Sequence, residues 1–159
     1  MNKLLFPLLA ALLLAACGNS ADTKYNEIVT ADFLRNVQRL DTDWARLIGG
    51  QFDAGQGGLP GNRANSPEQH LPELEHNLNQ VQTLSHSEDA SRYATSLSHY
   101  YELQIGYYQQ LKRYTETRDK ASQEAIAEQL NQAYRTLKAL PPQVFAAQKQ
   151  FLDQGSLPH

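Results

Sequence analysis

The sequence predicts an all-α protein: a bundle of about four main helices plus a short C-terminal helix, with a glycine-rich loop after the first helix. Two observations support this fold class. Gln, Leu and Ala are abundant and β-branched residues are few, which favours helix over strand. Apolar residues also recur every three or four positions over long stretches, the spacing that places them on one face of a helix.

Residues 1–16 have the three parts of a secretory signal peptide. Lys3 gives a positive start, and residues 4–16 form an apolar run of the length typical of a signal core, roughly 7–15 residues. This run is shorter than the ~20 residues that a membrane-spanning helix needs. We therefore expect residues 1–16 to be removed from the mature protein.

The segment Leu14-Ala15-Ala16-Cys17-Gly18 resembles the lipobox of bacterial lipoproteins. The resemblance implies cleavage between Ala16 and Cys17, a diacylglyceryl group on the Cys17 thiol and usually a further acyl chain on its new amine. Two or three acyl chains hold a protein firmly on a bilayer, at ~0.8 kcal/mol per buried CH₂. The alternative is an ordinary signal peptide followed by a free cysteine.

The residue after the cysteine indicates which membrane holds the anchor. It is Gly18 and not Asp, so the resemblance implies the outer membrane, with the face left open. The expected organisation is a signal peptide over residues 1–16, a lipidated tether over 17–23 and a single helical domain over 24–159.

Charge and cysteine content exclude several classes of partner and site. The formal net charge is −3, and loss of Lys3, the one charged residue of the leader, changes it to −4. This balance argues against nucleic acid and against a polybasic membrane-surface helix. Cys17 is the only cysteine, so the chain forms no internal disulfide and no thiolate metal site.

The first helix is predicted over residues 24–48, and Gly49-Gly50 ends it. Its apolar face consists of Phe33, Val37, Leu40, Trp44 and Leu47. Residues 49–66 hold most of the nine glycines and are predicted to be irregular. They form either a mobile connection or a lid that packs on the bundle through Phe52 and Leu59.

The remaining helix boundaries follow from capping and proline signals. Ser66-Pro67 suits a helix start, which Pro72 delays or kinks, and Ser85 to Glu88 have capping-box spacing. We expect the second helix up to Leu84, the third over 88–118, the fourth from Ser122 to Leu140 and a short fifth over 142–154.

Tyrosine dominates the third predicted helix. Four tyrosines stand seven residues apart and two more flank them, within an apolar arc roughly 200° wide. These residues are Tyr93, Tyr100, Tyr107 and Tyr114, flanked by Tyr101 and Tyr108. Either the rings pack in the core with their hydroxyls at its edge, or part of the arc is exposed as a groove. Such a groove suits an amphipathic helix of a partner or a small amphiphile.

Signals for catalysis or metal binding are weak. Glu73 and His76 form one Glu-x-x-His motif, whereas di-iron bundles use two. His70 and His76 are six residues apart and do not share a helix face. The pairs Asp41/Asp43 and Glu88/Asp89 are interpreted as surface charges, and no nucleophile elbow or phosphate loop is present. We predict no metal, no cofactor apart from the lipid on Cys17, and no enzymatic activity.

The leading functional hypothesis is a non-enzymatic envelope lipoprotein that binds another envelope protein through the tyrosine-rich face of the third helix. In architecture alone it resembles the small helical pilotin lipoproteins, which grip a helical segment of secretion-channel subunits. The alternative is a small-molecule carrier or sensor with a cavity among the tyrosine-bearing helices. A metal-dependent enzyme is the third possibility, which convergence of His70, His76 or His99 with carboxylates would favour.

Overall fold

The computed structural model describes residues 20–50, 52 and 69–155. Within these ranges the chain is helical and contains no strand, so the predicted all-α fold class is confirmed. The elements are α2 (Ser20–Ile48), α3 (His70–Thr83), the 3₁₀ turn η3 (Glu88–Ala90), α4 (Ser91–Glu116), α5 (Lys120–Ala139) and α6 (Pro141–Gly155). The predicted sites at Ala16, Cys17 and Leu59 lie outside the described residues.

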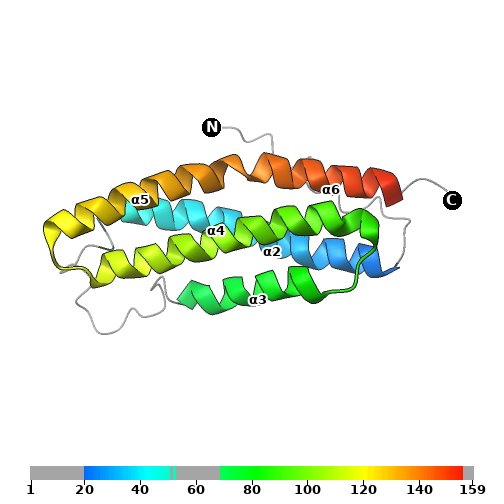
Figure 1. The fold of residues 1–159 in the computed structure, drawn as a ribbon, viewed down its shortest axis with the longest axis horizontal. Helices are drawn as coiled ribbons and strands as arrows, with labels where there is room; N and C mark the ends of the chain where they lie inside the picture. The colour runs from blue at the N-terminus through cyan, green and yellow to red at the C-terminus, as the bar shows by residue number, and fades with distance from the viewer. Residues whose placement is uncertain (1–19, 51, 53–68, 156–159) are drawn as a thin grey trace.

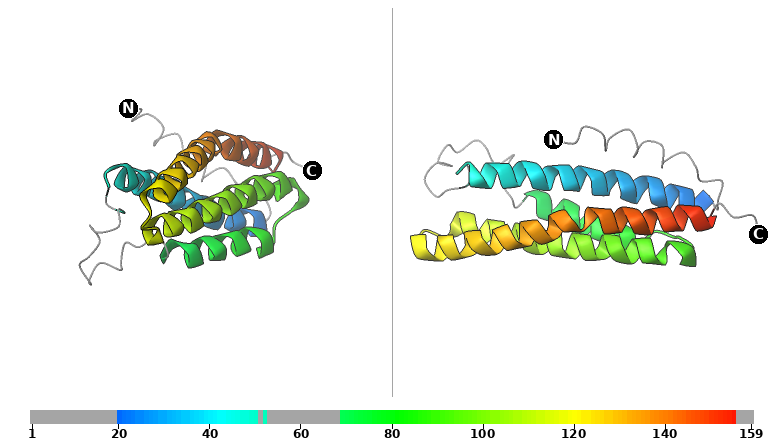
Figure 2. Two further views of the ribbon diagram at one scale, coloured as in Figure 1. Left: turned by 60° about the vertical axis from the view of Figure 1, so that its left-hand side comes forward. Right: turned by 90° about the horizontal axis from the view of Figure 1, so that it is seen from above.

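The helices form an elongated bundle (Figure 1). Helices α2 and α4 run parallel along its length, and α5 and α6 follow each other almost end to end above them (Figures 1 and 2). Helix α2 starts at the end of the bundle where α6 finishes, so Ser20 and the C-terminal turn of α6 lie at the same end. Helix α4 is central, because α3, α5 and α6 all pack closely against it.

The first helix begins earlier than the sequence predicts. Helix α2 starts at Ser20 and not at Lys24, so residues 20–23 are helical and are not part of a tether. Asp22, in this first turn, accepts a hydrogen bond from the backbone N–H of Ser87 at 2.7 Å. The predicted capping box of Ser85 and Glu88 does not form, because the N-cap of η3 is Ser87 and no side chain caps this turn.

Later boundaries differ by a few residues for identifiable reasons. Helix α3 begins at His70, which places Pro72 in its first turn, where a missing N–H removes no helical hydrogen bond. Helix α5 begins at Lys120 because Asp119, and not Ser122, is the N-cap: its carboxylate accepts the Ser122 N–H at 2.8 Å. Pro141 is the first residue of α6, a position that proline favours, and α6 is longer than the short tail helix predicted.

The apolar faces predicted from spacing form one core. Phe33, Leu40 and Leu47 of α2 are buried, and Val37 and Trp44 are half-buried against them. None of the described helices is long and apolar enough to cross a membrane.

A glycine in the middle of α4 provides a first test of this fold. A Cβ built at Gly106 meets no atom within 4 Å. Because glycine loses more backbone entropy than alanine on entering a helix, Gly106→Ala should raise the free energy of unfolding by about 0.5–1 kcal/mol in urea denaturation. Gly50→Ala is the matched control and should lower it, because Gly50 has a φ of 70°. A loss of stability in Gly106→Ala would contradict the open position of this glycine.

Candidate functional site

The six tyrosines predicted as a binding surface are buried. Tyr93, Tyr100, Tyr101 and Tyr108 are 0% exposed, Tyr107 is 1% exposed and Tyr114 is 8% exposed. The interpretation as core rings is therefore correct, and the interpretation as an exposed groove is wrong for this arrangement of the helices. The physical reason is that α2 covers this face of α4.

Two contacts show how α2 covers it. The ring of Phe33 meets the Tyr100 ring edge-on, with centroids 4.8 Å apart. The Thr30 hydroxyl and the Tyr93 hydroxyl are hydrogen-bonded at 2.8 Å. We refer to the α4 side chains at this interface as the tyrosine layer. Its members are Tyr93, Tyr100, Tyr101, Gln104, Tyr107 and Tyr108.

Helix α2 faces the interior of the bundle with polar as well as apolar residues. Asn26, Thr30, Asn36 and Asp43 are all 3% exposed or less. They fall at helical spacing with the buried Phe33 and Leu40, so the periodicity that identified the apolar face also included them. A search for apolar residues alone passed over these positions. The sequence reasoning did not single out Asn26, Thr30 or Asn36, and it placed Asp43 at the surface.

One polar network lies near the beginning of α2. The Asn26 side-chain oxygen accepts hydrogen bonds from the Thr30 hydroxyl at 3.1 Å and from the Gln148 amide of α6 at 2.8 Å. The same Gln148 amide donates to the Thr30 oxygen, also at 2.8 Å. Since Thr30 also pairs with Tyr93, this network joins α2, α4 and α6 through buried groups whose hydrogen bonds offset the cost of their desolvation.

A second cluster lies toward the end of α2 and is centred on a carboxylate. Asp43 is the only charged residue that is buried among the described positions. Its oxygens accept a hydrogen bond from the Tyr108 hydroxyl of α4 at 2.8 Å and one from the Arg46 guanidinium at 3.1 Å. The His70 Nε2 of α3 lies 3.4 Å away. The interpretation of Asp43 as a surface charge is therefore wrong, because the carboxylate holds three helices together.

The environment of His70 disfavours its protonated form. Burial lowers the pKa of His70 below its ordinary value of 6.5, and the positive charges of Arg39 and Arg46 act in the same direction. The nearby Asp43 carboxylate favours the protonated ring but does not outweigh burial. Arg39 is itself paired with Glu73 of α3 at 2.8 Å, so charged groups reinforce this contact between α2 and α3.

Part of the tyrosine layer has no hydrogen-bond partner. The hydroxyls of Tyr100, Tyr101 and Tyr107 and the side-chain oxygen of Gln104 are buried without one. Burial raises the pKa of each of these three phenols well above 10.0, and a carboxylate of α2 (Asp41, Asp32 and Asp43 respectively) raises it further. The three groups are therefore neutral hydroxyls in the interior of the bundle.

The other candidate residues are placed as follows. Phe52 is buried, with the Arg46 guanidinium 4.7 Å from its ring centre, in agreement with one half of the predicted lid contact. His76 and His99 are exposed, so His70 is the histidine that converges with a carboxylate. Asp41 lies at the surface, where it accepts a hydrogen bond from Tyr134 and pairs with Lys138 at 2.7 Å.

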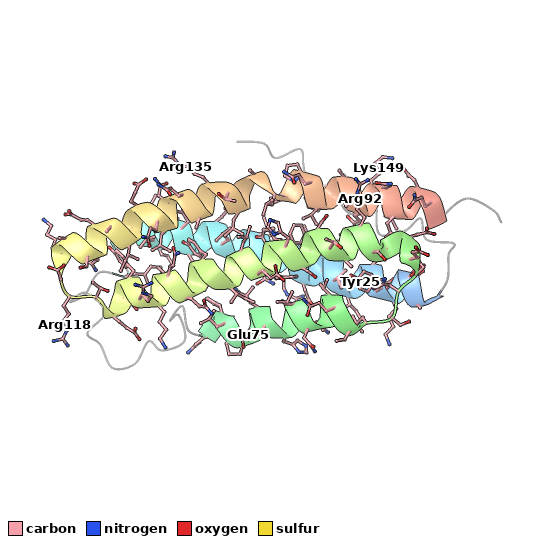
Figure 3. The ribbon with its side chains drawn as sticks, in the orientation of Figure 1. Tyr25, Glu75, Arg92, Arg118, Arg135 and Lys149 are labelled. Atoms are coloured by element: carbon pink, nitrogen blue, oxygen red, sulfur yellow. The ribbon has the colours of Figure 1, made fainter. Side chains whose placement is uncertain are left out.

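No group of three or more potential metal ligands occurs among the described residues. A shallow hollow of about 350 Å³ lies on the outer side of α6 and not among the tyrosine-bearing helices. Its lining includes Lys149, which points outward in Figure 3, as do Arg118 and Arg135.

The chain matches no protein-family model, no curated protein and no solved structure.

The layer contains a matched pair of tyrosines that tests this description. Tyr108→Phe should lower the free energy of unfolding by about 1–3 kcal/mol, because the buried Asp43 carboxylate loses a donor. Tyr107→Phe should leave it unchanged or higher, because the Tyr107 hydroxyl has no partner to lose. Chemical denaturation followed by circular dichroism measures both. Equal losses in the two variants would contradict the hydrogen-bond assignment.

The lowered pKa of His70 predicts a dependence of stability on pH. The unfolded chain binds a proton at this histidine more readily than the native protein does. The free energy of unfolding is therefore not reduced by this histidine above pH 6.5, and it falls progressively as the pH drops below that value. His70→Gln should therefore lose less stability than the wild type between about pH 7 and pH 5. The control His76→Gln, at an exposed position, should keep the wild-type dependence. Identical pH profiles for wild type and His70→Gln would contradict the lowered pKa of His70.

Proposed function

We propose that this protein is a non-enzymatic lipoprotein of the bacterial outer membrane that binds another envelope protein. The observation that carries the proposal is the lipobox-like segment ending at Cys17, directly before a helical bundle. Acyl chains on Cys17 would anchor the chain to lipid, and the bundle would be the part available to a partner.

The beginning of α2 supports a close attachment to the bilayer. Only three residue steps separate Cys17 from Ser20, which is a reach of at most about 10 Å. Helix α2 has 29 residues and is therefore about 43 Å long. An anchor at Cys17 would hold the end of the bundle that contains Ser20 and the last turn of α6 near the lipid, with the opposite end free to lie far from the anchor.

The arrangement of polar side chains supports a binding role more than catalysis. The buried polar groups of α2 bond to groups on α3, α4 and α6 and so serve the packing of helices. The tyrosine layer offers the large rings and polar tips that are enriched at protein interfaces. In the present arrangement α2 occupies that layer, so binding through these tyrosines requires α2 to move.

Two alternative functions, a small-molecule carrier and a metal-dependent enzyme, are each favoured by one observation. The unpartnered hydroxyls of Tyr100, Tyr101 and Tyr107 favour a carrier of small molecules with polar groups, bound among the tyrosine-bearing helices. The approach of His70 to Asp43 favours a metal-dependent enzyme. Native mass spectrometry of the purified protein and its metal content test these two alternatives directly.

The test of the proposed function is a crosslinking pull-down from the membranes that contain the full-length protein, read by mass spectrometry. We expect the wild-type protein in the outer-membrane fraction with a diacylglyceryl modification on Cys17. We also expect one dominant envelope protein crosslinked to it in near-stoichiometric amount.

Cys17→Ser is the matched control, because it removes the thiol and leaves the bundle unchanged. This variant should lose the lipid and leave the membrane fraction. If it stays in the outer membrane without lipid, the anchor assignment is wrong. If the wild-type protein is lipidated and crosslinks to no protein above background, the binding role is wrong and the carrier alternative is favoured.

A further inference from the structure

The interface between α2 and the tyrosine layer contains polar groups that remain unsatisfied. Three hydroxyls and the Gln104 side-chain oxygen are buried there without a partner. Buried polar groups in native proteins are almost always hydrogen-bonded, and an unpaired group keeps the full cost of losing water. Because these groups belong to consecutive turns of α4, and Tyr100 and Gln104 contact α2 directly, the cost is concentrated in one part of the core.

The same interface is the most polar part of the core that the structure describes. Helix α2 contributes more buried polar residues to the described core than α3, α4, α5 or α6 does. They are Asn26, Thr30, Asn36 and Asp43. By contrast, α3, α5 and α6 pack more closely on α4 than α2 does. The fold therefore consists of an α3–α6 unit packed closely on α4 and one helix, α2, that lies on a polar layer. Some groups of that layer are hydrogen-bonded to α2 and others lack a partner.

We propose that α2 undocks from α4 as a unit and that the tyrosine layer it uncovers binds an amphipathic helix of the partner protein. The identity of the partner rests on the proposed function, but the undocking of α2 does not. Undocking lets water reach the hydroxyls of Tyr100, Tyr101 and Tyr107, which removes part of the cost that opposes it.

The chemistry of the layer defines the helix that fits it. The incoming helix must present apolar residues at the positions of Phe33 and Leu40, which meet the rings of the layer. It must also present a hydroxyl to Tyr93, as Thr30 does, and an acceptor to Tyr108, as Asp43 does. These two polar contacts lie thirteen residues apart on the incoming helix and fix its register, in the way that buried polar residues fix register in coiled coils.

The first experiment is hydrogen exchange of the purified protein without any partner. The backbone amides of α2 should exchange through an opening of lower free energy than those of α4, and with a weaker dependence on denaturant. The variant Tyr100→Phe/Tyr101→Phe/Tyr107→Phe removes the three unpartnered hydroxyls and keeps the rings. It should slow exchange in α2 at least several-fold relative to α4. The control Tyr93→Phe removes a bonded hydroxyl and should accelerate exchange in α2.

The second experiment uses a peptide of residues 20–48 as the probe, with a photoreactive benzophenone in place of the Phe33 ring. We expect it to bind the purified protein at a rate that saturates at high peptide concentration, because undocking of the resident α2 becomes limiting. Illumination should then crosslink the probe to α4 at or next to Tyr100, whose ring meets Phe33 in the structure. A peptide that also carries Leu40→Lys, a charge at a buried position, should not bind.

The outcomes separate this inference from the proposed function. The inference is overturned if the backbone amides of α2 and α4 exchange through openings of equal free energy and the probe does not bind. This holds whether or not a pull-down yields a partner. Probe binding that crosslinks neither near Tyr100 of α4 nor near Phe145 of α6, the two rings that Phe33 meets, also overturns it. If α2 opens and the probe binds at Tyr100 but no envelope partner is captured, the undocking is supported and the proposed partner is what fails.

Discussion

The carboxylate of Asp43 is buried, and its hydrogen-bond donors lie on more than one helix. Its charge would be costly in the interior if the Tyr108 hydroxyl, the Arg46 guanidinium and the His70 ring did not surround it. These groups lie on α4, α2 and α3, so satisfying one side chain sets the positions of three helices. The pairing of Arg39 with Glu73 lies beside this cluster and reinforces the same contact between α2 and α3.

The opposite half of the interface is held by a neutral network. Asn26, Thr30, Tyr93 and Gln148 exchange hydrogen bonds among α2, α4 and α6. Between the two clusters, the tyrosine layer provides rings that pack well and hydroxyls that lack partners. The interface is therefore bonded near both of its ends and, through the Gln104 amide and the Asn36 carbonyl, at one point in its middle, where three tyrosine hydroxyls lack partners.

The contrast between α2 and the α3–α6 unit matters for the proposed anchoring at Cys17. The proposed lipid at Cys17 is joined to α2, and the close-packed unit of α3–α6 is reached only through the chain that follows α2. A conformational change at the tyrosine layer would then alter how the bundle stands relative to its anchor without releasing the protein from the membrane. Anchoring and partner binding would both act through the same helix.

The sequence alone determined the fold class, the approximate extent of each helix and the candidate anchor. These features follow from local signals: apolar residues at helical spacing, glycines and prolines at helix ends, and a short apolar leader that ends in cysteine. The tyrosines at heptad spacing were recognised as one wide face of α4. Local signals did not say whether that face meets solvent or another helix, because burial depends on what packs against it.

Only the tertiary structure decided which polar residues are interior. Asp43 and Asp41 look alike in sequence, yet Asp43 is buried among three helices and Asp41 pairs with Lys138 at the surface. Asn26, Thr30 and Asn36 share the inward face of α2 with Phe33. Each of them is hydrogen-bonded to a residue more than sixty positions away in the chain, on α4 or α6. Contacts between residues so distant in the chain are set by how the helices pack, and the spacing of residues within one helix carries no information about them.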